Sequence, residues 1–529
     1  MHRWKVFVVS FVVASAGIEI ARGQGRGGGS WSTIGGDAQR TSWVRSDPRI
    51  SKSAVQTPGV RLLWKTKLDN QVKQLNSLTQ PLLLPNIISY KGFKALAYVG
   101  GSSDNVYSID YDLARMFWKT HLSTAPATPQ PAGSLDCPGG LTAIARSTPS
   151  GAIPPPGAPA QRGAPPVGRG GGAGGRGGTN NVYAISSGGM VHTLNPQTGE
   201  DVAPPVKFLP PTANVVGSIL VDNILYAATA NNCGGAPNGV WAVDLASDAK
   251  TVLTWATKGG GVAGTAGPSF GTDGAIYVAT GEGDSSASTY SDAVVALEPR
   301  TLQLKDWFTP GKAPFAATPV AFQYKGRDLI VAANQDGRLY VLHGGSLGGA
   351  DHRTALYKTP LHSKGMADFA AGALASWEES AGTRWVLVPA AGPVHADTKF
   401  PITNGNVTNG SIMAFKLVEQ NGTPILQPAW VSRDMPSPLP PIIINGVVFA
   451  ISSGEYRTND GQMSATQRAQ RSKPAVLYAF DAMTGKELWT SGQTITSFVH
   501  GVGPSGGDGQ VYVVTYDGTL YVFGIPMEH

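Results

Sequence analysis

Between Val476 and Trp489 the chain reads VLYAFDAMTGKELW. An alternating apolar strand ends at an aromatic and an acidic residue, a turn follows, and a second strand carries a tryptophan. The Thr484-Gly485 pair suits the turn, and Trp489 stands where its ring can dock between neighbouring units. This pattern is typical of one blade of a β-propeller.

Related units return about every 50 residues, a spacing that favours a propeller. Most of them pair a strand ending in a polar residue with a later aromatic residue. The six copies are Val106–Asp110 with Trp118, Val182–Asn195 with Thr198-Gly199, Val240–Asp244 with Trp255, Ala293–Glu298 with Trp307, Leu339–His343 with Tyr357, and Ile412–Lys416 with Trp430. Together with the first unit they predict seven all-β, four-stranded antiparallel blades.

The two ends of the repeat region complete each other. Gln510–Thr515 and Thr519–Phe523 are two strands without a following Trp strand, whereas Arg61–Thr66 is a Trp strand, with Trp64, that has no predecessors. Pairing them closes the ring and removes the free sheet edges. The sequence therefore predicts eight blades, with an N-terminal strand joining the C-terminal blade.

The 529 residues divide into three parts. Residues 1–23 have a basic start, an apolar run and small residues at a cleavage position, which predicts a signal peptide and an exported, periplasmic or extracellular protein. Residues 24–59 form an N-terminal extension. Residues 60–529 form a single propeller domain with an insertion at about 150–179, whose Gly, Pro and Arg content predicts disorder.

Charge and hydropathy limit the partners. The formal net charge is +6 and charged residues make up 14% of the chain, which does not indicate a nucleic-acid partner. No apolar run downstream of the signal is long enough to span a bilayer. We expect a monomer without a membrane span, which binds a small ligand or an envelope protein.

The segment Asp481–Trp489 resembles the pyrroloquinoline quinone (PQQ) repeat of quinoprotein dehydrogenases and their non-enzymatic relatives. The opening WSTIGGDAQRT of Trp31–Thr41 is similar to the segment before the first blade in that family. The resemblance implies an eight-bladed fold. In the family's dehydrogenases it also implies PQQ above a Ca²⁺ ion held by a Glu and an Asn, a catalytic Asp, a Trp floor, a disulfide of adjacent cysteines and often a haem domain.

One loop matches the family's calcium loop in position. Thr280-Gly281-Glu282-Gly283-Asp284 follows a strand, and Glu282 replaces the calcium Asn, so Glu282 is the candidate calcium ligand, with Asp284 beside it at the cofactor site. Other family features are missing from the sequence. Gly259–Gly267 has no Trp, Phe308–Phe322 has no Asp, the two cysteines are not adjacent, and no Cys-x-x-Cys-His motif for haem occurs.

Further polar residues fall in loops on the expected ligand side of the ring. Glu455, Arg457 and His395 are candidate cofactor- or ligand-binding residues, and Arg457 could hold a carboxylate or phosphate. Asp397 lies in the same turn as His395, Asp368 precedes the sixth blade, and His500 enters the eighth. The alternative is that each is a solvated loop residue. The residues Asp110, Asp244 and Asp481 end strands of the repeat and are expected to form turns.

The two cysteines, Cys137 and Cys233, fall on the same side of neighbouring blades. In an exported chain they are expected to form a disulfide; the alternative is a pair of buried thiols. No spacing defines a nucleophile-base-acid triad or a zinc site, so no catalytic residue is predicted.

Two functions follow from these observations. The first is a binding or scaffold propeller with a degenerate quinone site, because the family fold is present while its chemical signature is mostly missing. The alternative is a periplasmic dehydrogenase that uses PQQ and calcium to oxidise an alcohol or sugar. A propeller hydrolase or lyase has no supporting constellation.

Overall fold

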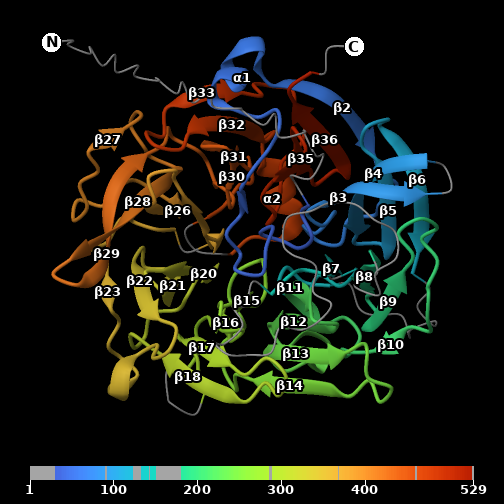
Figure 1. Ribbon diagram of the computed structural model, residues 1–529, viewed down its shortest axis with the longest axis horizontal. Helices are drawn as coiled ribbons and strands as arrows, with labels where there is room; N and C mark the ends of the chain where they lie inside the picture. Colours follow the sequence, from blue (N-terminus) through green and yellow to red (C-terminus); the bar gives the residue numbers. More distant parts are fainter. Residues whose placement is uncertain are drawn as a thin grey trace, which may run out of the picture.

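The computed structural model describes residues 30–89, 92–122, 133–141, 143–150, 180–284, 289–366, 368–458 and 462–526. The expected signal peptide and residues 151–179 of the expected insertion lie outside these ranges. Within them the chain forms a ring of eight β-sheets, in which the sequence runs round the ring from blade to blade (Figure 1). The predicted eight-bladed propeller is confirmed.

Each blade is an antiparallel meander that starts near the axis and ends at the rim. The first three blades consist of β3 (Leu82–Ser89), β4 (Gly92–Gly101), β5 (Asn105–Asp110) and β6 (Arg115–His121); β7 (Ala143–Arg146), β8 (Val182–Ile185), β9 (Met190–Leu194) and β10 (Val206–Lys207); and β11 (Asn214–Val221), β12 (Ile224–Ala230), β13 (Gly239–Asp244) and β14 (Val252–Ala256).

Blades four to seven continue this order. They consist of β15 (Ser269–Phe270), β16 (Ile276–Ala279), β17 (Val294–Leu297) and β18 (Leu304–Phe308); β20 (Val320–Tyr324), β21 (Arg327–Ala333), β22 (Leu339–His343) and β23 (Tyr357–Lys358); β25 (Ala375–Glu378), β26 (Arg384–Ala391), β28 (Gly410–Gln420) and β29 (Thr423–Val431); and β30 (Ile442–Ile444), β31 (Val447–Ser452), β32 (Val476–Asp481) and β33 (Glu487–Thr490).

Both ends of the chain build the eighth blade. The strand β2 (Arg61–Lys67) pairs with β36 (Thr519–Gly524), which follows β35 (Gln510–Val514) and β34 (Ser505–Gly507). Arg61 is opposite Gly524 and Lys67 is opposite Thr519, with a bulge between Leu62 and Trp64. Figure 1 shows the blue N-terminal strand beside the red C-terminal ones. The predicted closure of the ring is therefore confirmed.

Short elements extend this plan beyond four strands per blade. A parallel strand, β27 (Ile402–Thr403), joins β29 in the sixth blade, and β1 (Trp43–Val44) joins β30 in the seventh. A small parallel pair links β19 (Ala317–Thr318) with β24 (Gly372–Ala373). The helical segments are α1 (Lys52–Ala54), α2 (Ala465–Arg471) and the turns Val55–Gly59, Cys233–Gly235 and Gly349–Asp351.

The core consists of apolar layers between adjacent blades, because alternate side chains of a strand point to opposite sheet faces. In β16, Ile276 and Val278 pack with residues of the third blade, whereas Tyr277 and Ala279 pack with the fifth. Both faces of this strand are thus buried, which explains why its four residues, Ile276 to Ala279, include no charged side chain.

Tryptophans fasten one blade to the next. The indole N–H of Trp64 donates to the carbonyl of Tyr111 at 3.2 Å, that of Trp118 to Pro196 at 2.9 Å, and that of Trp430 to Ala482 at 3.0 Å. Each acceptor directly follows the strand-end residue Asp110, Asn195 or Asp481 of the next blade. The repeat therefore places a donor and its acceptor one blade apart.

The other expected docking tryptophans make ring contacts. Trp489 packs edge-on against Phe523 of the eighth blade at a centroid distance of 5.7 Å. Trp255 lies 5.9 Å from Tyr290, and Trp307 stacks on His352 at 4.6 Å. All six residues thus lie against aromatic rings or turns near a blade boundary.

Hydrogen bonds to the acidic residue and the docked tryptophan also shape the turns of the repeat. The Asp481 carboxylate accepts hydrogen bonds from the backbone N–H groups of Met483 and Thr484 at 2.8 and 3.0 Å. Gly485 has φ of +69°, and a Cβ there would lie 2.4 Å from the Trp430 ring of the preceding blade. The glycine of the repeat is therefore required by both backbone conformation and the docked tryptophan.

Replacing Trp430 by Phe should keep most of the ring contacts but leave the carbonyl of Ala482 without its donor. Because Trp430 is fully buried, we expect a loss of about 1–3 kcal/mol in the free energy of unfolding. Urea unfolding of the two proteins measures it. The control is Trp255→Phe, whose indole nitrogen has no hydrogen-bond partner among the described residues; an equal loss there would refute the hydrogen-bond explanation.

The N-terminal residues Trp31–Val44 lie along the axis of the propeller and are called the axial segment. It is bonded to an inner strand of each of the first seven blades. The contacts join Trp31 to Leu83, Ser32 to Arg146, Thr33 to Ser218, Ala38 to Phe270, Gln39 to Ala321, Thr41 to Ser376 and Ser42 to Ile443. Asp47 then accepts a hydrogen bond from the backbone of Gly509 in the eighth blade at 2.7 Å.

A buried arginine holds the axial segment together. Arg40 is 1% exposed and donates to the carbonyl of Pro268 at 2.9 Å and to the hydroxyl of Thr33 at 2.6 Å, with further bonds to backbone carbonyls of Ile34 and Ser218. Burial lowers the pKa of the Arg40 guanidinium to about 9, and the charge of Asp37 opposes this shift. The axial segment is thus an integral part of the propeller.

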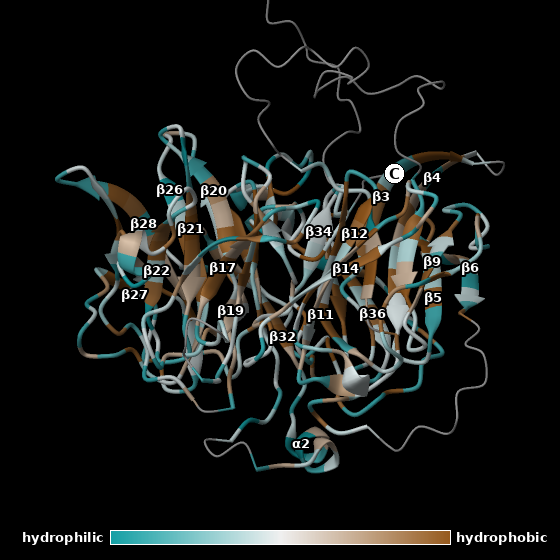
Figure 2. Ribbon diagram, turned by 90° about the horizontal axis from the view of Figure 1, so that it is seen from below, coloured by the Kyte–Doolittle hydropathy of each residue, from teal (hydrophilic) through white to brown (hydrophobic). Residues whose placement is uncertain are grey.

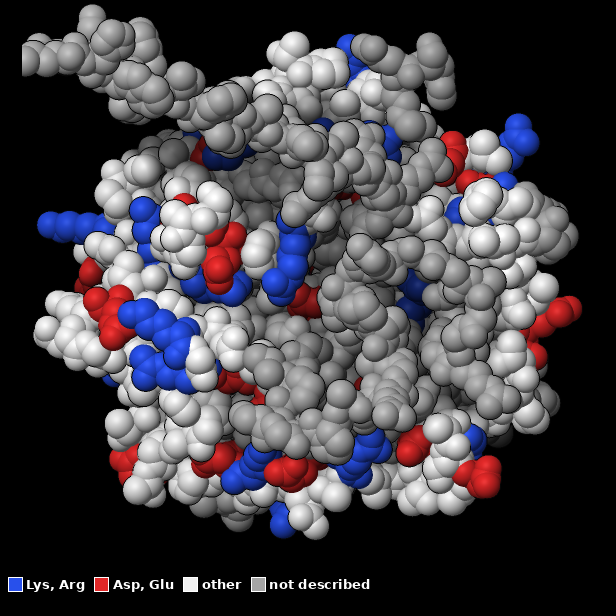
Figure 3. Space-filling view, in the orientation of Figure 1, with Lys and Arg blue, Asp and Glu red and all other residues white. Residues whose placement is uncertain are grey.

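Topology assigns the loops to two faces. In a four-stranded meander, the links between blades and the turns between second and third strands share one face, which we call the link face. Helix α2 lies in such a turn, between β31 and β32, and projects beyond the strand ends (Figure 2). On the face seen in Figure 3, the acidic and basic side chains of the described residues are interspersed.

Candidate functional site

The link face carries a buried cluster of charged residues, which we call the Glu455 cluster: Asp368, Glu455, Arg457, Arg468 and His500. They come from the link into the sixth blade, the turn after β31, helix α2 and the link into the eighth blade. Glu455 is 2% exposed, so its charge requires compensation by neighbouring groups.

Both carboxylate oxygens of Glu455 are occupied. Oε1 accepts from Arg468 at 3.1 Å, while Oε2 contacts Arg457 at 3.1 Å and Nδ1 of His500 at 3.0 Å. Burial alone would raise the pKa of the Glu455 carboxyl, but the charges of His500 and Arg457, with hydrogen bonds from His500 and Arg468, lower the pKa to about 2. Glu455 is therefore an anion that is paired within the protein.

The arginines are also engaged on their other sides. The second terminal nitrogen of Arg457 donates to the backbone carbonyl of Asp368 at 2.7 Å, and Arg468 pairs with the Asp368 carboxylate. The Arg457 guanidinium lies 5.8 Å from the centre of the Phe369 ring. Both terminal nitrogens of Arg457 are thus used inside the protein, where the sequence had suggested a contact with a ligand.

Helix α2 begins with a capping box in which Ser464 and Gln467 exchange hydrogen bonds. Its small residues Ala465 and Ala469 pack against an apolar group that includes Phe498. Arg468 faces the Glu455 cluster from the same helix. The helix was not anticipated, although the sequence Ser464-Ala465-Thr466-Gln467 has the pattern of a helix start.

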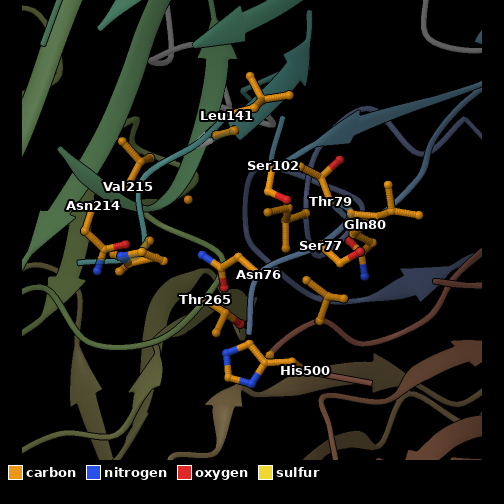
Figure 4. Close-up of a pocket in the computed structure, with 18 of the residues that line it drawn as sticks. Asn76, Ser77, Thr79, Gln80, Ser102, Leu141, Asn214, Val215, Thr265 and His500 are labelled. Carbon is orange, nitrogen blue, oxygen red and sulfur yellow. The ribbon is translucent and has the colours of Figure 1, made fainter. Parts of the chain in front are cut away.

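A pocket of about 250 Å³ opens beside this cluster, and we call it the axial pocket (Figure 4). Its walls come from the links into the first, second, third, fourth and eighth blades. It is lined by Ile34, Asn76, Ser77, Leu78, Thr79, Gln80, Ser102, Leu135, Pro138, Leu141, Ala143, Asn214, Val215, Val216, Gly217, Gly264, Thr265, His500, Gly501 and Val502. His500 joins the pocket to the Glu455 cluster.

The axial segment contributes to the wall of the pocket. Ile34 lines it, and Gln80 accepts from the indole N–H of Trp31 at 3.0 Å while donating to the carbonyls of Gly503 and Pro504. A buried glutamine with its amide fully used makes a rigid wall. Irregular segments from distant parts of the chain are thus held in one arrangement.

A second pocket of about 790 Å³ lies beside it, and we call it the outer pocket. It is lined by Gln71, Val72, Lys73, Gln74, Ser103, Asp104, Gly133, Ser134, Cys137, Pro138, Gly139, Gly140, Ser187, Thr212 and Gly234. Pro138 belongs to both pockets.

A disulfide joins Cys137 and Cys233, whose Cα atoms are 5.5 Å apart. It ties the link into the second blade to the turn between β12 and β13 of the third. Cys137 lines the outer pocket, so the bond fixes one of its walls.

Replacing both cysteines by serine should lower the free energy of unfolding by about 2–4 kcal/mol, because the bond closes a long loop in the unfolded chain. Urea unfolding with and without a reductant measures this. The reductant should shift the midpoint of the wild type only. A wild type that is as stable reduced as oxidised would contradict the expectation.

The remaining candidates lie apart from the Glu455 cluster. Glu282 and Asp284 are exposed in the turn between β16 and β17 of the fourth blade. His395 lies in the sixth blade, where its ring is 3.5 Å from Asp397. In the described part of the chain, no three His, Cys, Asp or Glu residues are grouped so that they could hold a metal ion. The role of Glu282 as a calcium ligand stays a prediction.

Several pocket residues were not found from the sequence. Asn76, Asn214 and Thr265 line the axial pocket; Asn76 and Thr265 stand in links before an inner strand, and Asn214 is the first residue of the inner strand β11. That position was a usable signal, because links between blades share one face. Arg468 was missed because helix α2 was not anticipated. No helix among the described residues is long and apolar enough to cross a membrane.

Comparison with known proteins agrees with this architecture. Residues 465–525 match the PQQ-repeat family described as "Outer membrane protein assembly factor BamB". This range contains α2, the outer half of the seventh blade and the last three strands of the eighth. No curated protein sequence matches the chain.

Three solved structures share the fold. The quinohemoprotein alcohol dehydrogenase of Comamonas testosteroni has a TM-score of 0.57 and 14% identity, over 94% of this chain and 81% of the other. A europium-containing methanol dehydrogenase has a TM-score of 0.55 and 11% identity, over 94% of this chain and 98% of the other. The quinohemoprotein alcohol dehydrogenase ADHIIG of Pseudomonas putida HK5 has a TM-score of 0.56 and 12% identity, over 95% of this chain and 82% of the other. The chain is therefore an eight-bladed β-propeller with the fold of these quinoprotein dehydrogenases, and its residues 465–525 match the PQQ-repeat family.

Proposed function

We propose that this chain is an exported binding or scaffold propeller whose quinone site is degenerate. The observation that carries this proposal is the electrostatic state of the link face. Its buried carboxylate, Glu455, is neutralised by the protein's own cations, and the axial pocket beside it has no Asp, Glu, Lys or Arg among its described lining residues.

The residues present do not fit calcium and PQQ. Ca²⁺ binds about six to eight oxygen ligands, so it needs several carboxylates or carbonyls directed at one point. Glu282 is exposed, and Glu455 lies between two guanidinium groups that would repel a cation. PQQ itself carries three carboxylates, for which the axial pocket offers no lysine or arginine among its described residues.

The alternative function is a PQQ- and calcium-dependent alcohol or sugar dehydrogenase. Its support is that this chain shares its fold with the three quinoprotein enzymes. A shared fold is evidence of architecture and does not by itself imply the same activity. Under this alternative Glu282 binds the ion. The residues Glu282, Asp284, His395, Glu455 and Arg457 are its candidate site.

Export is supported by the pattern of residues 1–23 and by the disulfide, since disulfides persist in oxidising compartments. A periplasmic or extracellular binding protein then recognises a small ligand or a partner protein through the link face. This proposal requires no metal and no cofactor.

Calorimetric titration of the mature chain with PQQ and Ca²⁺ tests the proposal. We expect no binding heat for the wild type, for Glu282→Ala or for the control Glu379→Ala, which changes a glutamate on the opposite face. Calcium-dependent binding that is lost in Glu282→Ala and kept in Glu379→Ala would establish the dehydrogenase site instead.

A further inference from the structure

The axial pocket combines aliphatic walls with uncharged hydrogen-bonding groups. Its aliphatic residues include Ile34, Leu135, Leu141, Val215 and Val502. None of the described lining residues is a Phe, Tyr or Trp, so the pocket lacks the aromatic surface on which sugar rings or flat cofactors stack. An aliphatic side chain fits such walls well, because it gains from burial without needing a partner.

The hydrogen-bonding groups of the pocket are of two kinds. Thr79, Ser102 and Gln80 already bond to other parts of the protein. The side chains of Asn76 and Asn214, in contrast, have no hydrogen-bond partner in the described ranges, and Figure 4 shows them on different walls of the pocket. A carboxamide offers a donor and an acceptor together, which matches the two polar groups of a peptide bond.

The outer pocket extends the axial pocket and contributes charged side chains. It adjoins the axial pocket at Pro138, and it is the larger of the two. Lys73 lines it without an ion pair among the described residues, whereas Asp104 is occupied by the N–H and hydroxyl of Ser187. Asp104 keeps its negative charge, but both of its oxygens already accept hydrogen bonds, so Lys73 is the charged group of the outer pocket that is left to pair with an acidic group of the occupant.

We propose that the link face binds an extended, acidic peptide segment of a partner protein. An aliphatic side chain of the peptide fills the axial pocket, its neighbouring peptide groups bond to Asn76 and Asn214, and the chain continues into the outer pocket, where an acidic residue lies beside Lys73. This inference rests on the proposed binding function and names the class of its partner.

The disulfide is part of this binding surface. Cys137 lines the outer pocket and the next residue, Pro138, lines both pockets, so the Cys137–Cys233 bond helps to keep the shared wall in place. A groove fixed in this way binds a flexible peptide at a lower entropic cost than a mobile loop does. The position of the bond is thus explained by binding as well as by folding.

The test is a library of capped, fluorescent heptapeptides screened against the mature chain, with one aliphatic or aromatic position and one acidic, neutral or basic position at varied spacing. We expect binders to combine an aliphatic residue with an acidic one. Asn214→Ala should weaken the best peptide by roughly tenfold without loss of folding, because this side chain has no partner to lose within the described protein.

The charge is tested separately. Lys73→Glu should weaken acidic peptides by roughly three- to tenfold and should leave neutral peptides with the same aliphatic residue unchanged. The matched control is Lys207→Glu, an exposed lysine on the outer strand of the second blade, which should change neither. Equal effects of the two substitutions would overturn the role of Lys73.

Other results separate this inference from the proposed function. A library without enriched peptides, or binding of maltotriose or cellotriose that depends on Asn214, would overturn the peptide proposal while leaving a binding propeller. Calcium-dependent binding of PQQ would overturn the binding function itself.

Discussion

Arg40→Ala should destabilise the protein by about 3–5 kcal/mol, because it removes a buried cation and leaves two backbone carbonyls without their donor. These carbonyls belong to Ile34 and Pro268, and the carboxyl of Asp37 loses its nearby charge as well. The measurement is the urea midpoint of unfolding, followed by tryptophan fluorescence.

Arg45→Ala is the matched control for this substitution. Arg45 is exposed, directly follows the axial segment, and lies over the Trp43 ring at 4.6 Å. We expect it to cost less than about 1 kcal/mol, as exposed charges usually do. If Arg45→Ala destabilises as much as Arg40→Ala, the internal bonding of the axial segment is not the cause.

The second large effect is expected for Glu455→Gln, at about 3–5 kcal/mol, because two arginines and His500 would then surround a neutral group. Helix α2 should lose protection first, since Arg468 attaches it to Glu455. Hydrogen exchange of residues 462–475 reports this directly. The surface pair Arg433–Glu487, through Glu487→Gln, is the control and should cost less than about 1 kcal/mol.

The effect of Glu455 should depend on pH in a defined direction. Its pKa in the folded state is about 2, below the usual value of 4.5, so the unfolded chain binds the proton first as the pH falls. The stabilisation is therefore complete above pH 4.5 and is lost as the pH approaches 2. The stability difference between wild type and Glu455→Gln should shrink over this range. A difference that stays constant would show that the charge of Glu455 is not responsible.

The blades could be predicted from the sequence because each blade repeats the same pattern of strand, turn and tryptophan residues. The acidic residue, the Thr-Gly turn and the tryptophan at Asp481, Gly485 and Trp489 are local features that recur along the chain. The docking partner of each tryptophan lies one repeat away, so its position follows from the period. Closure through Trp64 could be derived in the same way.

The axial segment could not be predicted in this manner. Its residues contact seven inner strands mainly through one or two backbone hydrogen bonds each, and such contacts leave no periodic pattern in the sequence. The contacts within the candidate site could not be predicted from the sequence either. Glu455, Arg457 and His500 were named as candidates, but their contact depends on how the turn after β31 and the link into the eighth blade are placed relative to each other. Glu282 matched a family position, and nothing in its sequence indicated that it would be exposed.

The pairing of β2 with β36 also governs when the protein can fold. Strand β2 is synthesised early but can pair with β36 only after the last residues of the chain have been synthesised. The axial segment likewise can form its hydrogen bonds only as each inner strand becomes available. Such high contact order makes folding slow and leaves apolar strands exposed in the meantime. A chain that crosses a membrane before folding would complete this ring on the far side, where its disulfide can also form.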